Sequence, residues 1–222
     1  MHALLFENIT VHDSNRGLAL QARDGPCAGG VCIYDVIFRQ IFINGTRFWP
    51  FKWWGDGSAI HIDTMLRTPT SGATGVANVT FEDIVAFSQG GAVLSGRLPG
   101  GHVEGVTLRR VNITITRWPA WNYSQEQGIF PNIEYGPSTV PHLSPGSPLN
   151  TRFDLTGFMP GLYVENVQGL ALEDLNIAFQ GERQPYWGSA CLNTSQANYT
   201  VSITGGSCDL GSASLNITES AH

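Results

Sequence analysis

The sequence contains few charged residues and almost no lysine. Charged residues make up 14% of its 222 residues, against roughly 25% in an average globular protein, and Lys52 is the only lysine. Helix surfaces are usually rich in Lys and Glu, and no segment combines a sustained 3.6-residue apolar period with helix caps. These absences argue against a helical protein.

Other absences exclude classes of partner. No apolar run approaches the ~20 residues needed to span a bilayer, and a formal net charge of −6 provides no basic face for nucleic acid. The four cysteines fit no common zinc-binding spacing. We therefore expect a monomer that binds neither membrane nor nucleic acid, and we expect no metal and no cofactor.

A short phrase recurs along the chain. Each copy has a turn residue, an apolar–variable–apolar triplet, two polar residues and a second apolar alternation; the copies begin at Asn8, Asp35, Asn78, Gly105 and Gly169. Alternation with period two is a strand signal, and two polar residues are too few for a hairpin between strands this short. We interpret them as a bend between two strands of one coil. Repetition of this kind is typical of solenoids.

The repeats predict an all-β fold, a parallel β-helix of three parallel sheets. Residues 1–222 form one domain in this interpretation, and the irregular spacing of the copies indicates loops of different length. Residues 117–160 form the longest of these, an insertion rich in proline and aromatic residues.

A third strand is expected after each phrase, at residues 17–21, 59–63, 92–96 and 161–165. Stacked in register, these strands place alternate residues toward the core. The expected inward ladders are Leu18, Ile60, Val93, Leu162 and then Leu20, Ile62, Ser95, Val164. The expected outward rows are Ala19, His61, Leu94, Tyr163 and then Gln21, Asp63, Gly96, Glu165. Such a polar outward face is either a ligand surface or simply a solvated one.

Aromatic loops beside this third sheet favour a sugar ligand. Trp53 and Trp54 belong to a loop that precedes one third strand, and the 117–160 insertion precedes another. Aromatic side chains stack on the C–H faces of sugar rings, while charged groups bond to the hydroxyls. The alternative is that the two tryptophans only pack their loop against the coil. Long irregular insertions in compact domains are commonly functional.

Two features predict a secreted, extracellular protein. Eight Asn-x-Ser/Thr acceptor sequences occur, at Asn8, Asn44, Asn78, Asn112, Asn122, Asn193, Asn198 and Asn216. Three of these, at Asn8, Asn78 and Asn112, also belong to the coil pattern, whereas glycosylation accounts for the other five. The cysteines fall into two local pairs, Cys27 with Cys32 and Cys191 with Cys208, which we expect to form disulfides.

The first residues contain no signal peptide pattern. Residues 1–6 lack a basic region and a long apolar core, and they run directly into the first coil. Solenoids begin with an atypical capping repeat, whereas these residues resemble interior coil. We expect the chain to be the C-terminal part of a longer protein.

Three stretches carry a family resemblance. Residues 15–25 (NRGLALQARDG), 36–41 (VIFRQI) and 46–55 (TRFWPFKWWG) occur in an order that resembles the polygalacturonase-type family of glycoside hydrolases, family 28. It is closest to divergent members in which an Arg-Gly-Ile-Gly-Ile-Gln-x-Arg-Asp phrase precedes a Trp-Trp-Gly loop. The resemblance covers about residues 7–179. It implies a right-handed parallel β-helix, a cleft on the third sheet, and hydrolysis of pectic or related polysaccharides with inversion.

The sequence departs from the family at the catalytic positions. The family's Asn-Thr-Asp phrase, Asp-Asp pair and Gly-His-Gly phrase are absent, and Gly101-His102-Val103, which we place in a turn, is only a partial match. The family's substrate-binding Arg-Ile-Lys falls on Ala19-Leu20-Gln21, so both cations are missing. Arg16, Arg23 and Arg47 are the cations able to compensate in binding an anionic sugar.

The remaining residues suggest one pair of candidate catalytic carboxylates. Asp63 and Glu165 lie two coils apart on the expected outward row, roughly 9–10 Å between backbones, and inverting glycosidases need carboxyl groups about 6.5–9.5 Å apart. Stacking places many such pairs on a solenoid, so we assign no catalytic residue and retain these two as candidates. We expect substrate contacts from Arg16, Gln21, Arg23, Arg47, Trp53, Trp54, His61, Asp63 and Tyr163.

Three functions remain open. The first is the C-terminal, substrate-binding portion of a secreted polysaccharide hydrolase whose catalytic residues lie upstream. The second is a non-catalytic glycan-binding or adhesion β-helix, which the missing cations favour. The third is a polysaccharide lyase of the same architecture, although such an enzyme would need clustered carboxylates with a basic residue nearby, and the outward rows lack that cluster.

Overall fold

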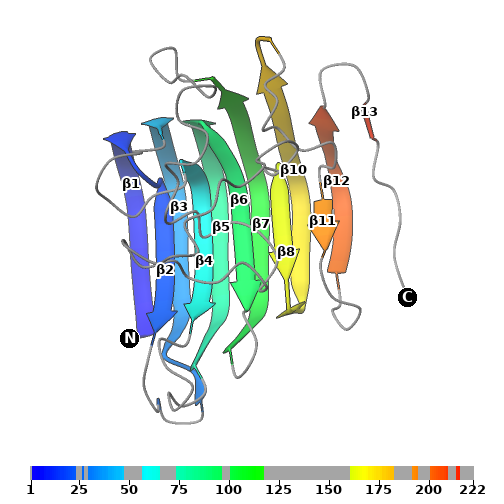
Figure 1. Ribbon diagram of the computed structural model, residues 1–222. Helices are drawn as coiled ribbons and strands as arrows, with labels where there is room; N and C mark the ends of the chain where they lie inside the picture. The colour runs from blue at the N-terminus through cyan, green and yellow to red at the C-terminus, as the bar shows by residue number, and fades with distance from the viewer. Residues whose placement is uncertain are drawn as a thin grey trace, which may run out of the picture.

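The computed structural model describes residues 2–23, 27, 30–47, 57–65, 74–96, 101–117, 161–182, 192–194, 201–209 and 214–215. These residues are almost entirely β-strand and contain no α-helix (Figure 1). The strands are β1 (His2–Ser14), β2 (Leu18–Arg23), β3 (Ile33–Thr46), β4 (Ser58–Met65), β5 (Thr74–Ser88), β6 (Gly90–Gly96), β7 (Gly101–Thr116), β8 (Leu162–Glu165), β9 (Val167–Gln168), β10 (Leu170–Gln180), β11 (Leu192–Thr194), β12 (Val201–Asp209) and β13 (Ser214–Leu215).

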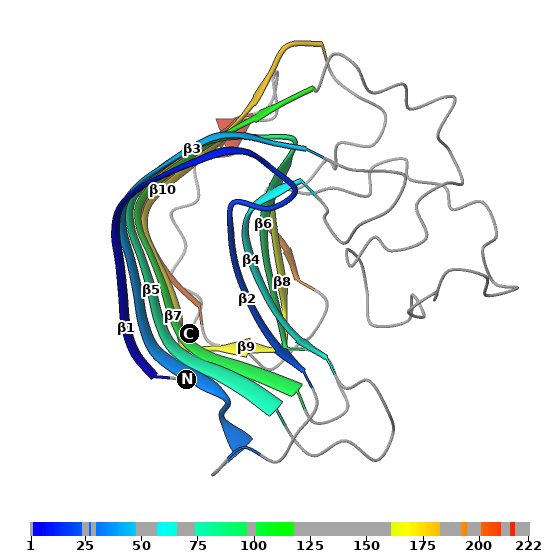
Figure 2. The ribbon, with the colours of Figure 1, turned by 90° about the vertical axis from the view of Figure 1, so that its left-hand side faces the viewer.

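The strands form two sheets that face one another (Figure 2). The larger sheet has the order β1-β3-β5-β7-β10-β12-β13, with β9 beside β7, and the smaller has the order β11-β8-β6-β4-β2. Every pairing is parallel except that of β12 with β13. The chain alternates between the sheets as it adds strands, so the all-β, parallel part of the sequence prediction is confirmed.

The larger sheet contains two of the three sheets that the sequence predicts. β5 is 15 residues long and bends at Asn78 and Asp83, where φ is 51° and 55°. Its pairing with β7 continues on both sides of the second bend, at Phe81 and Ile84. Because the ladder is not interrupted there, the two predicted strands are halves of one bent strand, and the described residues form two sheets rather than three.

The bends occur at the polar positions of the repeated phrase. Positive φ, a conformation that Gly, Asn and Asp adopt at least cost, occurs in two rows across neighbouring strands. The first row is Ala3, Asp35, Asn78, Gly105 and Gly169, and the second is Asn8, Gln40, Asp83, Arg110 and Asp174. The predicted bends are therefore confirmed for the copies that begin at Asp35, Asn78, Gly105 and Gly169.

The first copy of the phrase is misaligned in the sequence prediction. Glu7 pairs with Arg39 and Ile9 pairs with Ile41, which places Asn8 in the second row of bends. The copy therefore starts near Ala3 and not at Asn8. Both bends accept asparagine and both precede an apolar alternation, so the pattern alone fits either position.

The core lies between the two sheets and is built from stacked apolar side chains. Phe6, Phe38 and Phe81 stack face to face with ring centroids 4.8 and 5.1 Å apart. The largest side chains with less than 2% exposure are Phe81, Ile41, Ile43, Ile60, Ile62, Ile84, Leu94, Leu108 and Ile113. Burial of each large aliphatic side chain contributes roughly 1.5–3 kcal/mol, so this column is the main source of stability.

The predicted register of β6 is wrong by one residue. Ala92 pairs with Ile60 and Leu162, and Leu94 pairs with Ile62 and Val164. The inward ladder therefore contains Ala92 in place of Val93, and the next contains Leu94 in place of Ser95. A one-residue slip exchanges the two faces of a strand. The prediction aligns Ala92 with the first residue of the neighbouring third strands, whereas in the structure Gly91 holds that position.

A close contact between backbones determines which residue aligns with the first residue of the neighbouring third strands, and that residue is Gly91. A Cβ atom at Gly91 would lie 1.9 Å from the carbonyl oxygen of Gly161, and that oxygen accepts a hydrogen bond of 2.9 Å from the Ala92 amide. Only glycine allows this approach.

One predicted disulfide is present. Cys27 and Cys32 are bonded, with their Cα atoms 5.1 Å apart. The Cys32 amide donates to the carbonyl oxygen of Gly75 at 2.9 Å, which ties the disulfide to β5. In the second predicted pair, Cys191 and the side chain of Cys208 lie outside the described residues.

Candidate functional site

The candidate site is the face of the smaller sheet that points away from the core. Core packing uses Leu18, Leu20 and their register partners, so the alternate residues lie on the opposite face. The first row there is Ala19, His61, Val93 and Tyr163, and the second is Gln21, Asp63, Ser95 and Glu165. Each row spans β2, β4, β6 and β8, which lie side by side in Figures 1 and 2.

Two members of these rows differ from the sequence prediction. The shifted register of β6 places Val93 where Leu94 was expected and Ser95 where Gly96 was expected. Ser95 adds a hydroxyl between the two carboxylate positions, and its carbonyl oxygen accepts a hydrogen bond of 3.4 Å from Thr64.

The rows differ strongly in accessibility from one end to the other. Ala19 is exposed and Gln21 is half-buried at β2, whereas His61 and Asp63 have 0% exposure and Tyr163 has 3%. These three side chains are therefore not exposed to solvent in this structure. A buried carboxylate or imidazole needs polar partners. The accessible end is the β2 end.

The two candidate carboxylates occupy the expected positions along the sheet. Asp63 pairs with Ser95, and Ser95 pairs with Glu165, so their backbones lie two strands apart, about 9–10 Å. The side chain of Glu165 lies outside the described residues. The spacing agrees with that of an inverting pair, and a catalytic role for these residues stays a prediction.

The three candidate cations have different surroundings. Arg16 is half-buried in the turn between β1 and β2. Arg47 forms an ion pair with Asp13 on the adjacent coil, which compensates its charge. Arg23 ends β2 opposite Met65, and its side chain lies outside the described residues. Arg16 and Arg47 are therefore the two candidate cations whose side chains the structure describes.

The remaining predicted contacts fall outside the described part of the chain. Trp53 and Trp54 are among these residues, and so is the insertion from residue 118 to residue 160. Their contact with sugar stays a prediction.

His102 lies in a strand and not in a turn, which corrects the sequence prediction. It is the second residue of β7 and is half-buried. Its ring lies directly beside Gly75, where a Cβ atom would come within 2.3 Å of Nε2. This packing gives His102 a structural role.

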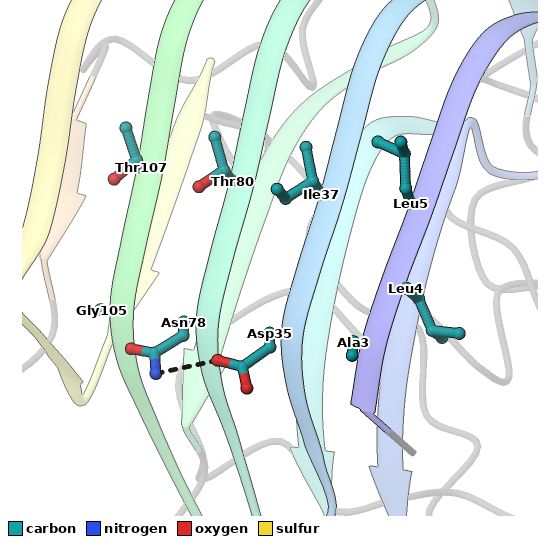
Figure 3. A pocket seen from close by; sticks show the side chains of 9 residues that line it. All are labelled: Ala3, Leu4, Leu5, Asp35, Ile37, Asn78, Thr80, Gly105 and Thr107. Atoms are coloured by element: carbon teal, nitrogen blue, oxygen red, sulfur yellow. Dashed lines mark hydrogen bonds between the residues drawn. The ribbon is translucent and has the colours of Figure 1, made fainter.

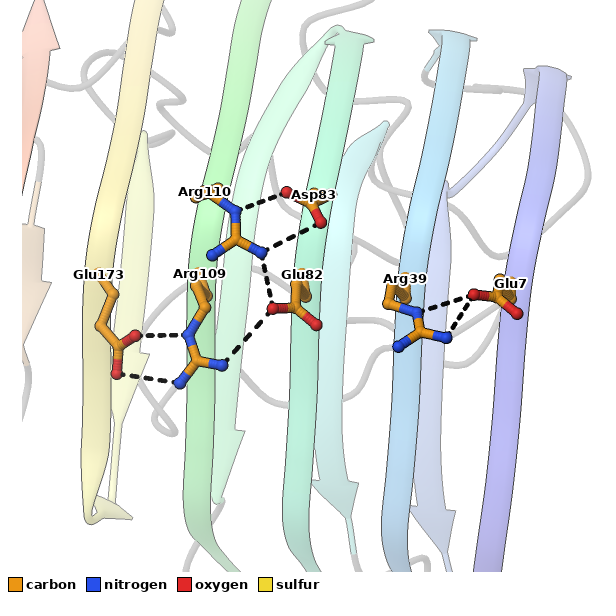
Figure 4. Close-up of polar contacts among 7 residues, drawn as sticks. All are labelled: Glu7, Arg39, Glu82, Asp83, Arg109, Arg110 and Glu173. Atoms are coloured by element: carbon orange, nitrogen blue, oxygen red, sulfur yellow. Dashed lines mark hydrogen bonds and ion pairs between the residues drawn. The ribbon is translucent and has the colours of Figure 1, made fainter.

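A charged ladder on the outer face of the larger sheet is a second cluster, which sequence reasoning missed (Figure 4). Glu7, Arg39, Glu82, Arg109 and Glu173 occupy one register row across β1, β3, β5, β7 and β10. Arg39 Nε donates to Glu7 at 2.8 Å, and Arg109 lies 2.5 Å from Glu173 and 3.5 Å from Glu82. In the aligned phrases, the first of the two polar positions carries charges of alternating sign, and this is the signal in the sequence that could have revealed the ladder.

The neighbouring row adds a second arginine. Arg110 Nε donates to Asp83 at 2.6 Å, and its Nη2 donates to Glu82 at 2.7 Å. The hydrogen bond from Arg110 lowers the pKa of Asp83, and the bond from Arg109 lowers the pKa of Glu173. The pKa values of both arginines are raised in turn. The side chains are 19–48% exposed, so solvent screens the pairs and each contributes little stability.

A shallow groove crosses the same outer face near the first bend (Figure 3). It has a volume of about 600 Å³ and crosses β1, β3, β5 and β7. Asn78 Nδ2 donates to Asp35 Oδ1 at 3.2 Å in its wall, and the exposed Leu5 and Ile37 form its apolar part. It contains no acid–base pair positioned for catalysis among its lining residues.

No group of three or more His, Cys, Asp or Glu residues in the described ranges is arranged to hold a metal ion. Within the same ranges, no helix has the length and apolarity of a membrane span.

Comparisons with protein-family models, curated proteins and solved structures found no significant match to this chain.

Proposed function

We propose that this chain is the C-terminal, substrate-binding portion of a secreted polysaccharide hydrolase of the polygalacturonase type, folded as a right-handed parallel β-helix. The observation that carries the proposal is the register of the smaller sheet. It aligns Gln21, Asp63, Ser95 and the backbone of Glu165 in one polar row across four strands. The resemblance of residues 15–25 and 46–55 to that family supplies the reaction class.

The sugar is proposed to contact the β2 end of the site. Gln21 and Arg16 are half-buried there, and Ala19 is exposed, so hydroxyl groups can reach an amide and a guanidinium. Toward β8 the side chains of His61, Asp63 and Tyr163 are buried, so a sugar cannot reach them there. Because the family's carboxylate phrases are absent from this chain, the catalytic acid and base are proposed to lie outside it.

A non-catalytic glycan-binding β-helix is the second candidate. The pairing of Arg47 with Asp13 and the presence of Ala19 and Gln21 at the family's cation positions favour it. Both candidates predict sugar binding at the same face, and they differ in whether cleavage occurs when upstream residues are present.

Calorimetric titration with pectic and neutral oligosaccharides tests binding at the proposed face. Arg16→Ala and Gln21→Ala are each expected to weaken binding about 2- to 10-fold, the equivalent of one hydrogen bond. Arg110→Ala is the matched control on the opposite outer face and is expected to leave the dissociation constant unchanged. Equal effects of the Arg16 and Arg110 variants would contradict the proposed location.

Release of reducing sugar from pectic substrate tests whether the catalytic residues lie in this chain or outside it. The purified 222-residue chain is expected to release none. Release that Asp63→Asn abolishes would instead make Asp63 a catalyst within this chain.

A further inference from the structure

The acceptor sequence at Asn44 lies between two exposed aromatic side chains. Phe42 precedes Asn44 by two residues on β3 and therefore points to the same, outer face. Phe87 on β5 is the register partner of Asn44. Both phenylalanines are 39% exposed, and their rings meet edge to face with centroids 6.1 Å apart. Contiguous exposed apolar side chains mark candidate interaction surfaces.

We propose that Asn44 carries an N-linked glycan whose first N-acetylhexosamine packs on Phe42 and Phe87. The C–H face of a pyranose ring matches the electron-rich face of an aromatic ring, and a sugar joined to Asn44 starts from a residue that has both rings among its neighbours on the same face. The inference does not rest on the proposed hydrolase function. It requires only that the chain passes through a secretory pathway.

The chemistry of attachment is a glycosyl transfer to the side-chain amide. A lipid-linked oligosaccharide diphosphate donates the sugar: its C1–O bond to the diphosphate breaks, and a C1–Nδ2 bond to Asn44 forms. The amide loses one proton to a base of the transferase, and the lipid diphosphate leaves. The amide retains one hydrogen, which can still meet His12 Nδ1, 3.3 Å from Asn44 Nδ2 in this structure.

The surroundings of Thr46 indicate whether glycosylation comes before or after the folding of this coil. Its hydroxyl is the second recognition element of the acceptor sequence, but the residue is only 4% exposed and the hydroxyl donates to the carbonyl oxygen of Gly57. The transferase therefore has to act before this coil closes. Attachment precedes folding, and the sugar reaches the phenylalanines as β5 pairs with β3.

Other acceptor asparagines on this sheet lack the aromatic pair. Asn78 is exposed but donates to Asp35 at 3.2 Å, and Asn112 lies opposite Val85 and accepts a hydrogen bond of 3.1 Å from Asn176. Asn78 is therefore a matched control on the same face.

The test expresses the full chain with a secretion signal in a eukaryotic host and measures site occupancy by peptide mass spectrometry. Asn44 is expected to be glycosylated in most molecules, and Asn44→Gln is expected to remove one glycan from the secreted chain. A secreted or translocated chain in which Asn44 is unmodified overturns the proposal.

Thermal unfolding tests the packing of the sugar. The glycan is expected to raise the melting temperature by about 2–4 °C relative to Asn44→Gln, the shift that one aromatic contact gives in a domain of this size. Phe42→Ser and Phe87→Ser should abolish that increment, whereas Ile37→Ser, which removes another exposed apolar side chain, should preserve it. Removal of the glycan from the folded wild-type chain by an amidase provides a second measurement that needs no aromatic variant.

Each result of the thermal test bears on the proposal. An increment that persists in both phenylalanine variants, or that Asn78→Gln removes equally well, would show that the glycan does not pack on the aromatic pair. Loss of the increment only in the two phenylalanine variants supports the assignment.

Discussion

Gly91 and Gly45 show two different reasons for glycine in this protein. At Gly91, a Cβ atom would lie 1.9 Å from the backbone oxygen of Gly161. At Gly45, φ is +91° and no atom lies within 4 Å of the position of a Cβ. The first glycine is required by contact between coils, and the second by backbone conformation alone.

Alanine substitution separates these two requirements. Gly91→Ala is expected to cost about 3 kcal/mol or more, because backbone atoms of the next coil must move. Gly45→Ala should cost only about 1–2 kcal/mol, the conformational penalty of a left-handed residue. Urea unfolding of both variants measures the difference, and a smaller cost at Gly91 than at Gly45 would show that the register of β6 is not as described.

The charged ladder gives a pH dependence at the residue scale. The pKa values of Asp83 and Glu173 are lowered in the folded protein from ordinary values of 3.8 and 4.5, in each case chiefly by a hydrogen bond from arginine. The unfolded chain therefore takes up these protons first as the pH falls. The contribution of each carboxylate is fully present above its ordinary pKa and is lost as the pH falls through the lower folded value.

Glu173→Gln is expected to reduce the loss of stability between pH 7 and pH 3, since it removes one of these protonations. Glu104→Gln, on an exposed residue of β7, is the control that leaves both arginines with their partners. Urea midpoints measured at the two pH values provide the comparison. A pH dependence unchanged by Glu173→Gln would contradict the ion pair with Arg109.

At the scale of single elements, the alternation of apolar residues predicts which face of a strand is buried. It correctly places Ile60 in the core and Asp63 on the opposite face. It cannot distinguish Gly91 from Ala92 as the residue that aligns with Gly17, because the difference depends on an approach to Gly161 from another coil. The bends are predictable from Asn, Asp and Gly. That the strand segments on either side of a bend belong to one continuous sheet depends on hydrogen bonds between coils.

Two isoleucines on neighbouring elements test this alternation. Ile60 on β4 has 0% exposure, whereas Ile37 on β3 is 41% exposed. Ile60→Asp places an unpaired carboxylate in the core and is expected to prevent folding. Ile37→Asp should change the free energy of unfolding by about 0.5 kcal/mol or less, as surface substitutions do. Circular dichroism and soluble yield of the two variants report the outcome, and a folded Ile60→Asp protein would overturn the assigned core.

At the scale of the whole molecule, the sequence predicts a parallel all-β coil because the same phrase returns with matched polar positions. It does not predict how accessible the candidate site is. Strand alternation shows that His61 and Tyr163 point away from the core, but it does not show that these side chains are buried. The same limit applies to Arg47, whose partner Asp13 lies 34 residues away.

The central claim is that polysaccharide binds to the face of the smaller sheet at the β2 end. Hydrogen–deuterium exchange of the purified chain, measured with and without a saturating pectic oligosaccharide, tests it most directly. Added sugar is expected to slow exchange in peptides that cover β2 and β4, and to leave peptides from the middle of β3 and β5 unchanged. Protection confined to the larger sheet, or none at saturating sugar, would contradict the claim.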